Sequence, residues 1–131
     1  MMDAVVPGVL IVDDEPSVRQ VLELVCARIG LRTFATACGH EAVTLYERHR
    51  GEIQLVLLDV NMPTIDGPAT LARLRQVAPD VRVCFMSGAT GHYTVEGLLA
   101  MGAERFFEKP FRFDRLGPEL LALASANRAA A

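Results

Sequence analysis

Unbroken aliphatic runs alternate along the chain with segments whose apolar residues recur at helical spacing. Val9–Val12 and Leu55–Leu58 predict strands covered on both faces, because a strand with one solvated face would show polar residues at alternate positions. A mixed segment such as 31–36 is typical of an edge strand. The predicted strands are 8–13, 31–36, 53–59, 81–86 and 103–108.

A helix is predicted after each strand. Pro16 opens the first helix, in a turn where a missing N–H is tolerated, and Gly30 ends it. Its predicted apolar stripe is Val18, Val21, Leu22, Val25 and Ile29. The other helices are predicted at 40–50, after the turn 66–68, from 95 to 102, and around 116–123.

Strict alternation of strand and helix predicts an α/β fold, with a five-stranded parallel sheet and helices on both faces. The 131 residues suit a single domain. We expect this domain to span 1–124. Residues 125–131 carry no periodic pattern beyond alanine and are expected to be a tail: a frayed helix end, the start of a linker or a cloning scar.

Composition excludes several classes of function. Hydrophobic residues make up 51%, enough for a core, and the net charge of −3 is too mild for a nucleic-acid surface. The three cysteines form no C-x-x-C pair, so neither a disulfide framework nor a zinc site is indicated, and buried thiols in a reducing cytoplasm are expected. No apolar stretch reaches the ~20 residues of a membrane span, and no signal-peptide pattern opens the chain.

The polar residues whose side chains could bind a ligand or react follow the predicted strands. Asp13 and Asp14 follow the first strand, Asp59 ends the third, Ser87 follows the fourth and Lys109 the fifth. Open α/β sheets bind ligands at the carboxyl ends of their strands, so we expect these side chains to lie together.

Three carboxylates suit a hard cation, and Mg²⁺ fits best because it prefers oxygen and keeps waters that a phosphate can displace. Lys109 is the only lysine in the sequence and offers a compact positive charge. Together with the Ser87 hydroxyl, these groups can stabilise a phosphoryl group in transit, and one carboxylate can form an acyl phosphate.

On these motifs the sequence resembles the receiver domains of bacterial two-component response regulators, including the chemotaxis-regulator type. The resemblance covers about residues 7–124 and implies a flavodoxin-like doubly wound (βα)5 fold with strand order 2-1-3-4-5. The matching stretches are Val12–Glu15, Leu58–Pro63, Met86–Gly88 and Phe107–Phe111.

The resemblance implies that Asp59 is the phosphoacceptor. Asp14, Asp59 and the backbone carbonyl of Asn61 would bind Mg²⁺, with Asp13 acting partly through water. Lys109 would pair with the phosphoryl oxygens, and the Lys109–Pro110 peptide bond would be cis. Ser87 would swing to the phosphoryl group when it arrives.

Three further roles follow from the resemblance. Phe106 occupies the position of a switch aromatic, where tyrosine is frequent, although ordinary packing at the sheet edge remains an alternative. Asn61 and Ala89 would lie beside the attacking water and tune dephosphorylation. Phosphorylation would reshape the face of the fourth helix, fifth strand and fifth helix, which would bind a partner or a second copy of the chain.

The predicted function is a cytoplasmic phosphoacceptor module that catalyses only its own phosphorylation and dephosphorylation. Its partner would be a sensor histidine kinase or a histidine phosphotransfer protein; no nucleic acid or membrane contact by the domain itself is expected. One alternative is an aspartate-nucleophile phosphatase, which needs a second aspartate where Asn61 stands. The other is a degenerate receiver that acts only by binding.

Residues outside this set are predicted to be structural or solvated. His40, His49 and His92 are scattered and are expected at the surface rather than as metal ligands. The arginines at 73, 75 and 82 are expected to be solvated ends of helices and strands.

Overall fold

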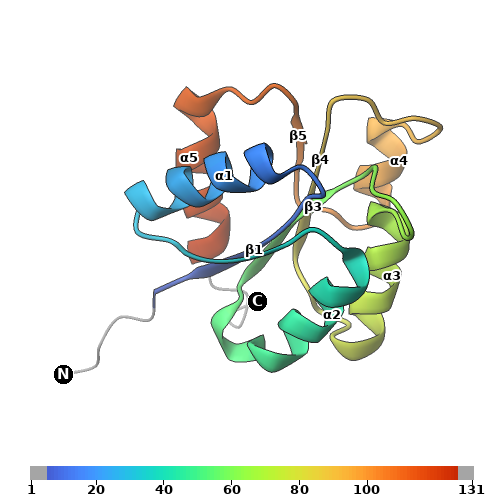
Figure 1. The fold of residues 1–131 in the computed structure, drawn as a ribbon, viewed down its shortest axis with the longest axis horizontal. Coiled ribbons are helices and arrows are strands. Elements are labelled where there is room, and N and C mark those ends of the chain that lie inside the picture. The colour runs from blue at the N-terminus through green and yellow to red at the C-terminus, as the bar shows by residue number, and fades with distance from the viewer. Residues whose placement is uncertain (1–5, 127–131) are drawn as a thin grey trace.

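Five parallel strands form one sheet in the order β2-β1-β3-β4-β5 (Figure 1). The computed structural model describes residues 6–126. The strands are β1 (Gly8–Val12), β2 (Arg32–Thr36), β3 (Leu55–Asp59), β4 (Val83–Ser87) and β5 (Phe106–Glu108). The helices are α1 (Pro16–Arg28), α2 (Gly39–Arg48), α3 (Gly67–Val77), α4 (Val95–Ala100) and α5 (Phe113–Ser125), with a short 3-10 turn η1 (Arg50–Glu52). The predicted α/β fold and strand order are confirmed.

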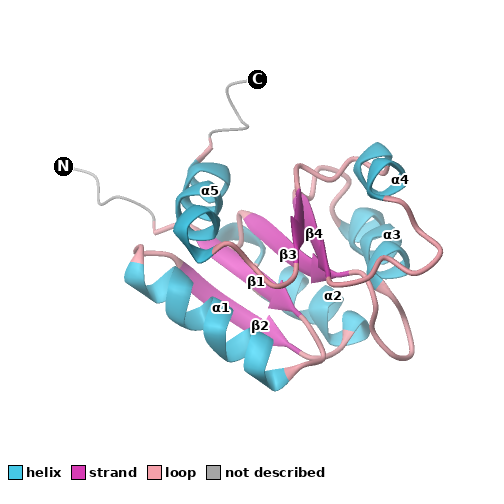
Figure 2. Ribbon diagram, turned by 90° about the horizontal axis from the view of Figure 1, so that it is seen from above, coloured by secondary structure: helices cyan, strands magenta, loops and turns pink. Residues whose placement is uncertain are grey.

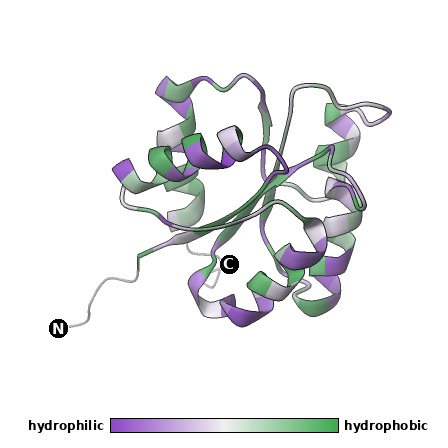
Figure 3. Cartoon of the chain, viewed as in Figure 1, coloured by the Kyte–Doolittle hydropathy of each residue, from purple (hydrophilic) through white to green (hydrophobic). Residues whose placement is uncertain are grey.

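The sheet separates two apolar layers. Helices α1 and α5 cover one face, and α2, α3 and α4 cover the other (Figure 2). Alternate residues of one strand enter different layers: Leu10 packs with the α2–α4 layer, whereas Val9 and Ile11 pack with the α1–α5 layer. Hydrophobic colouring accordingly runs along the middle of the sheet, while the helices show both kinds of residue (Figure 3). The absence of polar residues from β1 thus has a direct cause, since both of its faces are covered.

Strand boundaries differ from the predicted ones mainly at the edge of the sheet. Every residue of β1, β3 and β4 is buried, whereas β2 has partly exposed residues, as predicted for an edge strand. Strand β5 is the other edge and is shorter than predicted, covering three residues. Ser87 was expected in a loop but is the last residue of β4.

Two predicted side-chain environments are wrong. Arg82 was expected in solvent but is only 8% exposed, and its guanidinium lies 3.4 Å from the Glu104 carboxylate. It directly precedes the inner strand β4, every residue of which is buried. Val21 was expected in the core but is 39% exposed, because it faces a surface cleft beside Phe113.

The histidines lie at or near the surface, as expected, and one of them also stacks on an aromatic ring. His40 and His92 are exposed, and His49 is half-buried against Phe34, with ring centroids 4.5 Å apart. Within residues 6–126 no helix has the length and apolar character needed to cross a bilayer. Ser125 ends α5, and 127–131 lie outside the described residues, so the division of the chain at 124 stays a prediction.

Replacing Gly8 with alanine should destabilise the fold. A Cβ at Gly8 would lie 2.0 Å from the backbone carbonyl oxygen of Glu52, which cannot move without shifting η1. We expect a loss of about 1–3 kcal/mol in the free energy of unfolding, measured by urea denaturation. Gly51→Ala is the matched control, because nothing lies within 4 Å of the added atom. Equal effects of the two substitutions would contradict the close packing of β1 on η1.

Candidate functional site

The carboxyl ends of β1 and β3 bring three acidic side chains together. Val12 pairs with Leu58 across the sheet, so Asp13, Asp14 and Asp59 come to the same edge. One carboxylate oxygen from each lies within 4.8 Å of the others. Asp13 and Asp59 are buried, and Asp14 is exposed. The convergence predicted from the strand ends is therefore present.

Lys109 brings the compensating charge to the acidic cluster. Its Nζ lies 2.7 Å from Asp13 Oδ2 and 3.6 Å from Asp59 Oδ1. It also lies 3.7 Å from Glu15, a residue that sequence reasoning did not assign to the site although it directly follows the acidic pair. The lysine is placed by β5, and the Lys109–Pro110 peptide bond is cis, as predicted.

Burial and neighbouring charge set the protonation of these groups. Burial, followed by the negative charge of Asp13, raises the pKa of the Asp59 carboxyl from 3.8 to about 7, against the opposing effect of Lys109. Burial alone would lower the pKa of Lys109, but its hydrogen bond with Asp13 and the charge of Asp59 raise it overall. Lys109 therefore stays protonated at neutral pH, where Asp59 is only partly ionised, and added positive charge near Asp59 would favour its ionised form.

A network of hydrogen bonds surrounds Ser87. Its hydroxyl donates to the backbone carbonyl of Ala89 at 2.6 Å and accepts from the Ala89 amide at 3.1 Å. The Asn61 side-chain amide donates to Ser87 Oγ at 3.1 Å and also to the Ala89 carbonyl. Ser87, Asn61 and Ala89 are thus brought together as predicted, but the Ser87 proton is directed at the backbone rather than at Asp59.

Phe106 is half-buried on β5 and pairs in register with Phe85 on β4. It packs at the margin of the layer formed by α2, α3 and α4. Ser87 lies two residues beyond Phe85 on β4, so Ser87 and Phe106 lie on neighbouring strands. The switch role of Phe106 stays a prediction.

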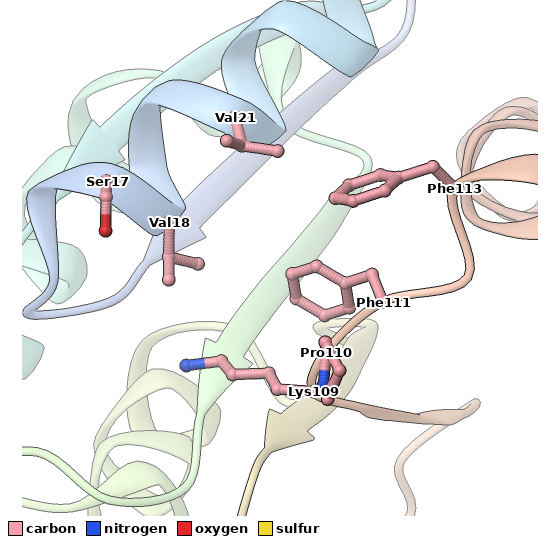
Figure 4. A pocket seen from close by; sticks show the side chains of 7 residues that line it. All are labelled: Ser17, Val18, Val21, Lys109, Pro110, Phe111 and Phe113. Carbon is pink, nitrogen blue, oxygen red and sulfur yellow. The ribbon is translucent and has the colours of Figure 1, made fainter.

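Two surface hollows border Lys109. The first is an open cleft of about 560 Å³ lined by carboxylates and Asn61, through which a small anion can reach Asp59. The second is apolar, about 210 Å³, and lies between α1 and the chain that follows Lys109 (Figure 4). The rings of Phe111 and Phe113 form one of its walls, with centroids 6.1 Å apart.

The acidic cluster fits a hard divalent cation. Its donors are carboxylate oxygens from adjoining strand ends, the type of ligand that Mg²⁺ takes. One carboxylate is exposed and faces the open cleft, which leaves room for water or a phosphate oxygen. No histidine or cysteine belongs to a candidate metal cluster in the described part of the chain.

The chain is similar to known proteins over most of its length. The family described as "Response regulator receiver domain" matches residues 9–120. The chain is 35% identical to the sensor kinase CckA of Brucella abortus over 82% of its own length but only 11% of that kinase. It is 32% identical to the sporulation initiation phosphotransferase F of Bacillus subtilis, covering 82% of this chain and 86% of that protein.

A solved structure is similar to this chain in fold. The CheX–CheY–BeF3–Mg²⁺ complex from Borrelia burgdorferi contains a chain similar to this one, with a TM-score of 0.79 and 30% sequence identity. The similarity covers 88% of this chain and 87% of that chain. The likeness in fold therefore extends through most of the chain.

Without a metal ion, Asp59→Asn should stabilise the protein at neutral pH. A carboxyl whose pKa is raised on folding loses stability as pH rises from the unfolded value of 3.8 through the folded value of about 7. The substitution should remove this loss, raising the free energy of unfolding at pH 8 by up to about 4 kcal/mol. The measurement is urea denaturation with a chelator at pH 4 and pH 8.

Asp80→Asn, at an exposed position, serves as the control and should change stability little at either pH. A wild-type protein equally stable at both pH values, with no gain in the Asp59 variant, would contradict the raised pKa of Asp59.

Proposed function

Because this chain belongs to the response regulator receiver domain family, we propose that it accepts a phosphoryl group on Asp59 from a phosphohistidine. One observation carries the proposal. The buried Asp59 carboxylate lies 3.6 Å from the Lys109 ammonium, beside two more carboxylates and an open cleft. A nucleophile, a fixed positive charge and a hard-cation site are thus adjacent where an anion can enter.

In the proposed reaction an ionised oxygen of Asp59 forms a new P–O bond with the phosphorus. The P–N bond of the phosphohistidine breaks, and its electron pair stays with the imidazole, which takes up a proton from solvent. Lys109 interacts with the negative phosphoryl oxygens as charge builds on them. Its bond to Asp13 holds the ammonium at the cleft before the donor arrives.

Mg²⁺ is the proposed cofactor. The carboxylates of Asp13, Asp14 and Asp59 and the backbone carbonyl of Asn61 would hold it. When bound, it supplies positive charge that favours ionised Asp59 and neutralises phosphoryl oxygens. The B. burgdorferi relative, whose complex includes BeF3 and Mg²⁺, supports this assignment.

Ser87 would bind the transferred phosphoryl group by turning its hydroxyl from Ala89 toward Asp59. Phe106 would follow by moving into the space that Ser87 leaves, and the face of α4, β5 and α5 would change shape. This face would then bind a partner protein or a second copy of the chain. Asn61 and Ala89, which border Ser87, would set the rate at which water removes the phosphoryl group.

The proposed donor is a sensor histidine kinase or a histidine phosphotransfer protein, in the cytoplasm. The names of the similar proteins, a sensor kinase and a phosphotransferase, support this class of partner. Free cysteines at 26, 38 and 84 suit a reducing compartment. The domain would catalyse only its own phosphorylation and dephosphorylation.

Acetyl phosphate with Mg²⁺ should add a single phosphoryl group to the wild-type protein, measured by intact-mass spectrometry. Asp59→Asn should abolish the adduct, because an amide cannot form the acyl phosphate, and Asp80→Asn should retain it. An adduct that survives Asp59→Asn would identify another acceptor. Turnover of a phosphate ester beyond one equivalent would instead favour the phosphatase.

Mg²⁺ alone should stabilise the wild-type protein through the acidic cluster. At roughly 100 times its Kd, the ion should raise the free energy of unfolding by about 2.7 kcal/mol. Asp14→Asn should lose most of this gain, and because Asp14 is exposed the substitution should leave the metal-free fold intact. Equal stabilisation of both proteins would contradict the metal site, and no stabilisation of the wild type would favour a degenerate receiver.

A further inference from the structure

The hydrogen bond between Tyr93 and Asp66 joins the two loops that border Ser87. The Tyr93 hydroxyl donates to Asp66 Oδ2 at 2.7 Å. Asp66 lies in the loop between β3 and α3, and Tyr93 lies in the loop between β4 and α4; both loops lie at the same end of the molecule (Figure 1). None of the roles described above uses this contact.

Asp66 is a rigid anchor. Its other carboxylate oxygen caps α3 by accepting from the Ala69 amide at 2.9 Å. Its backbone carbonyl accepts from both the amide and the hydroxyl of Thr70, which is buried. The next amide, that of Gly67, donates to the Val60 carbonyl at 2.9 Å. A group bonded to Asp66 is therefore bonded to the framework of the domain.

The loop that carries Tyr93 also holds Ser87 in place. The Ala89 carbonyl accepts the Ser87 proton, and the Asn61 amide fastens that same carbonyl to the loop after β3. Gly88 lies between Ser87 and Ala89, and Gly91 lies between Ala89 and Tyr93. Gly91 has a φ of +66°, a conformation in which glycine is unstrained. The segment can therefore change shape readily, unless its far end is held at Tyr93.

Tyr93 is well suited to hold that end. Its ring packs at the margin of the core layer formed by α2, α3 and α4, and it immediately precedes Thr94, the N-cap of α4. The hydrogen bond to Asp66 raises the pKa of the Tyr93 phenol, so the donor proton stays in place at neutral pH. A bond from a hydroxyl to a carboxylate is about twice as strong as one between neutral groups.

We propose that Tyr93 and Asp66 are positioning residues that hold the loop of residues 88–94 in the arrangement in which Ala89 retains the Ser87 hydroxyl. This inference rests on the proposed function, because the Tyr93–Asp66 bond would oppose the proposed rotation of Ser87 toward the phosphoryl group. Breaking the bond loosens the loop, leaves Ala89 linked to the loop after β3 through the Asn61 bond, and so favours the arrangement in which Ser87 reaches Asp59. The protein then binds a phosphoryl group or its analogue more tightly.

Tyr93→Phe tests this directly, because it removes the hydroxyl and keeps the ring. Its apparent Kd for beryllofluoride in the presence of Mg²⁺, followed by NMR, should fall by roughly fivefold or more relative to wild type. Asp66→Asn should act in the same direction but less, since an amide oxygen still accepts a bond. Tyr46→Phe, on α2 with Asp80 and Arg50 as the charged neighbours of its hydroxyl, is the matched control and should leave the Kd unchanged.

The sign of the change separates positioning from a general structural role. Damage to the fold would lower the thermal midpoint and weaken beryllofluoride binding, whereas the proposal requires tighter binding. An unchanged or higher Kd for beryllofluoride in Tyr93→Phe would overturn the proposal.

Hydrogen exchange gives a readout that does not depend on phosphoryl chemistry. The Ala89 amide, bonded to Ser87 Oγ, should exchange faster in Tyr93→Phe than in wild type, while amides of β1 and β3 should not change. If the wild type fails to bind beryllofluoride, the proposed function fails, yet faster exchange at Ala89 would still support the positioning role. Unchanged exchange at Ala89 would overturn that role whatever the binding result.

Discussion

Repulsion among Asp13, Asp14 and Asp59 is the constraint on which the rest of this structure depends. Two unit charges about 4 Å apart repel by about 4 kcal/mol at an effective dielectric near 20. A single lysine offsets part of this by lying 2.7 Å from Asp13 and 3.6 Å from Asp59. Burial first, and then the negative charge of Asp13, still raises the pKa of Asp59 to about 7, which leaves the cluster receptive to further positive charge.

The parallel sheet is what makes this crowding sustainable. Strands β1, β3 and β4 are buried along their whole length between two helical layers, so their ends are held by packing. The acidic residues come directly at those ends, and their backbone positions cannot relax away from one another. The loops that follow are less constrained, and bonds such as those of Asn61 and Tyr93 determine their shape.

Most of the site could be predicted because it follows the strands along the chain. Asp13 and Asp59 follow or end an apolar run and Lys109 follows a predicted strand, so a correct strand assignment also places each side chain at the correct edge. Arg82 was misjudged by the same reasoning, because its charge indicated solvent while its place before β4 buried it. Glu15 was missed as a neighbour of Lys109 because it lies beyond the strand end, at the N-cap of α1, where a strand assignment does not fix the direction of the side chain.

By itself, then, the sequence determined the order of elements, the buried strands and the identity of the groups at one sheet edge, because hydrophobic periodicity and strand ends are local properties. Only the tertiary structure decided where individual protons and side chains are directed. Ser87 donates to Ala89, and Tyr93 bonds to Asp66 across 27 residues of chain. Such contacts depend on rotamers and loop paths that arise when separate elements pack, and no spacing along the chain encodes them.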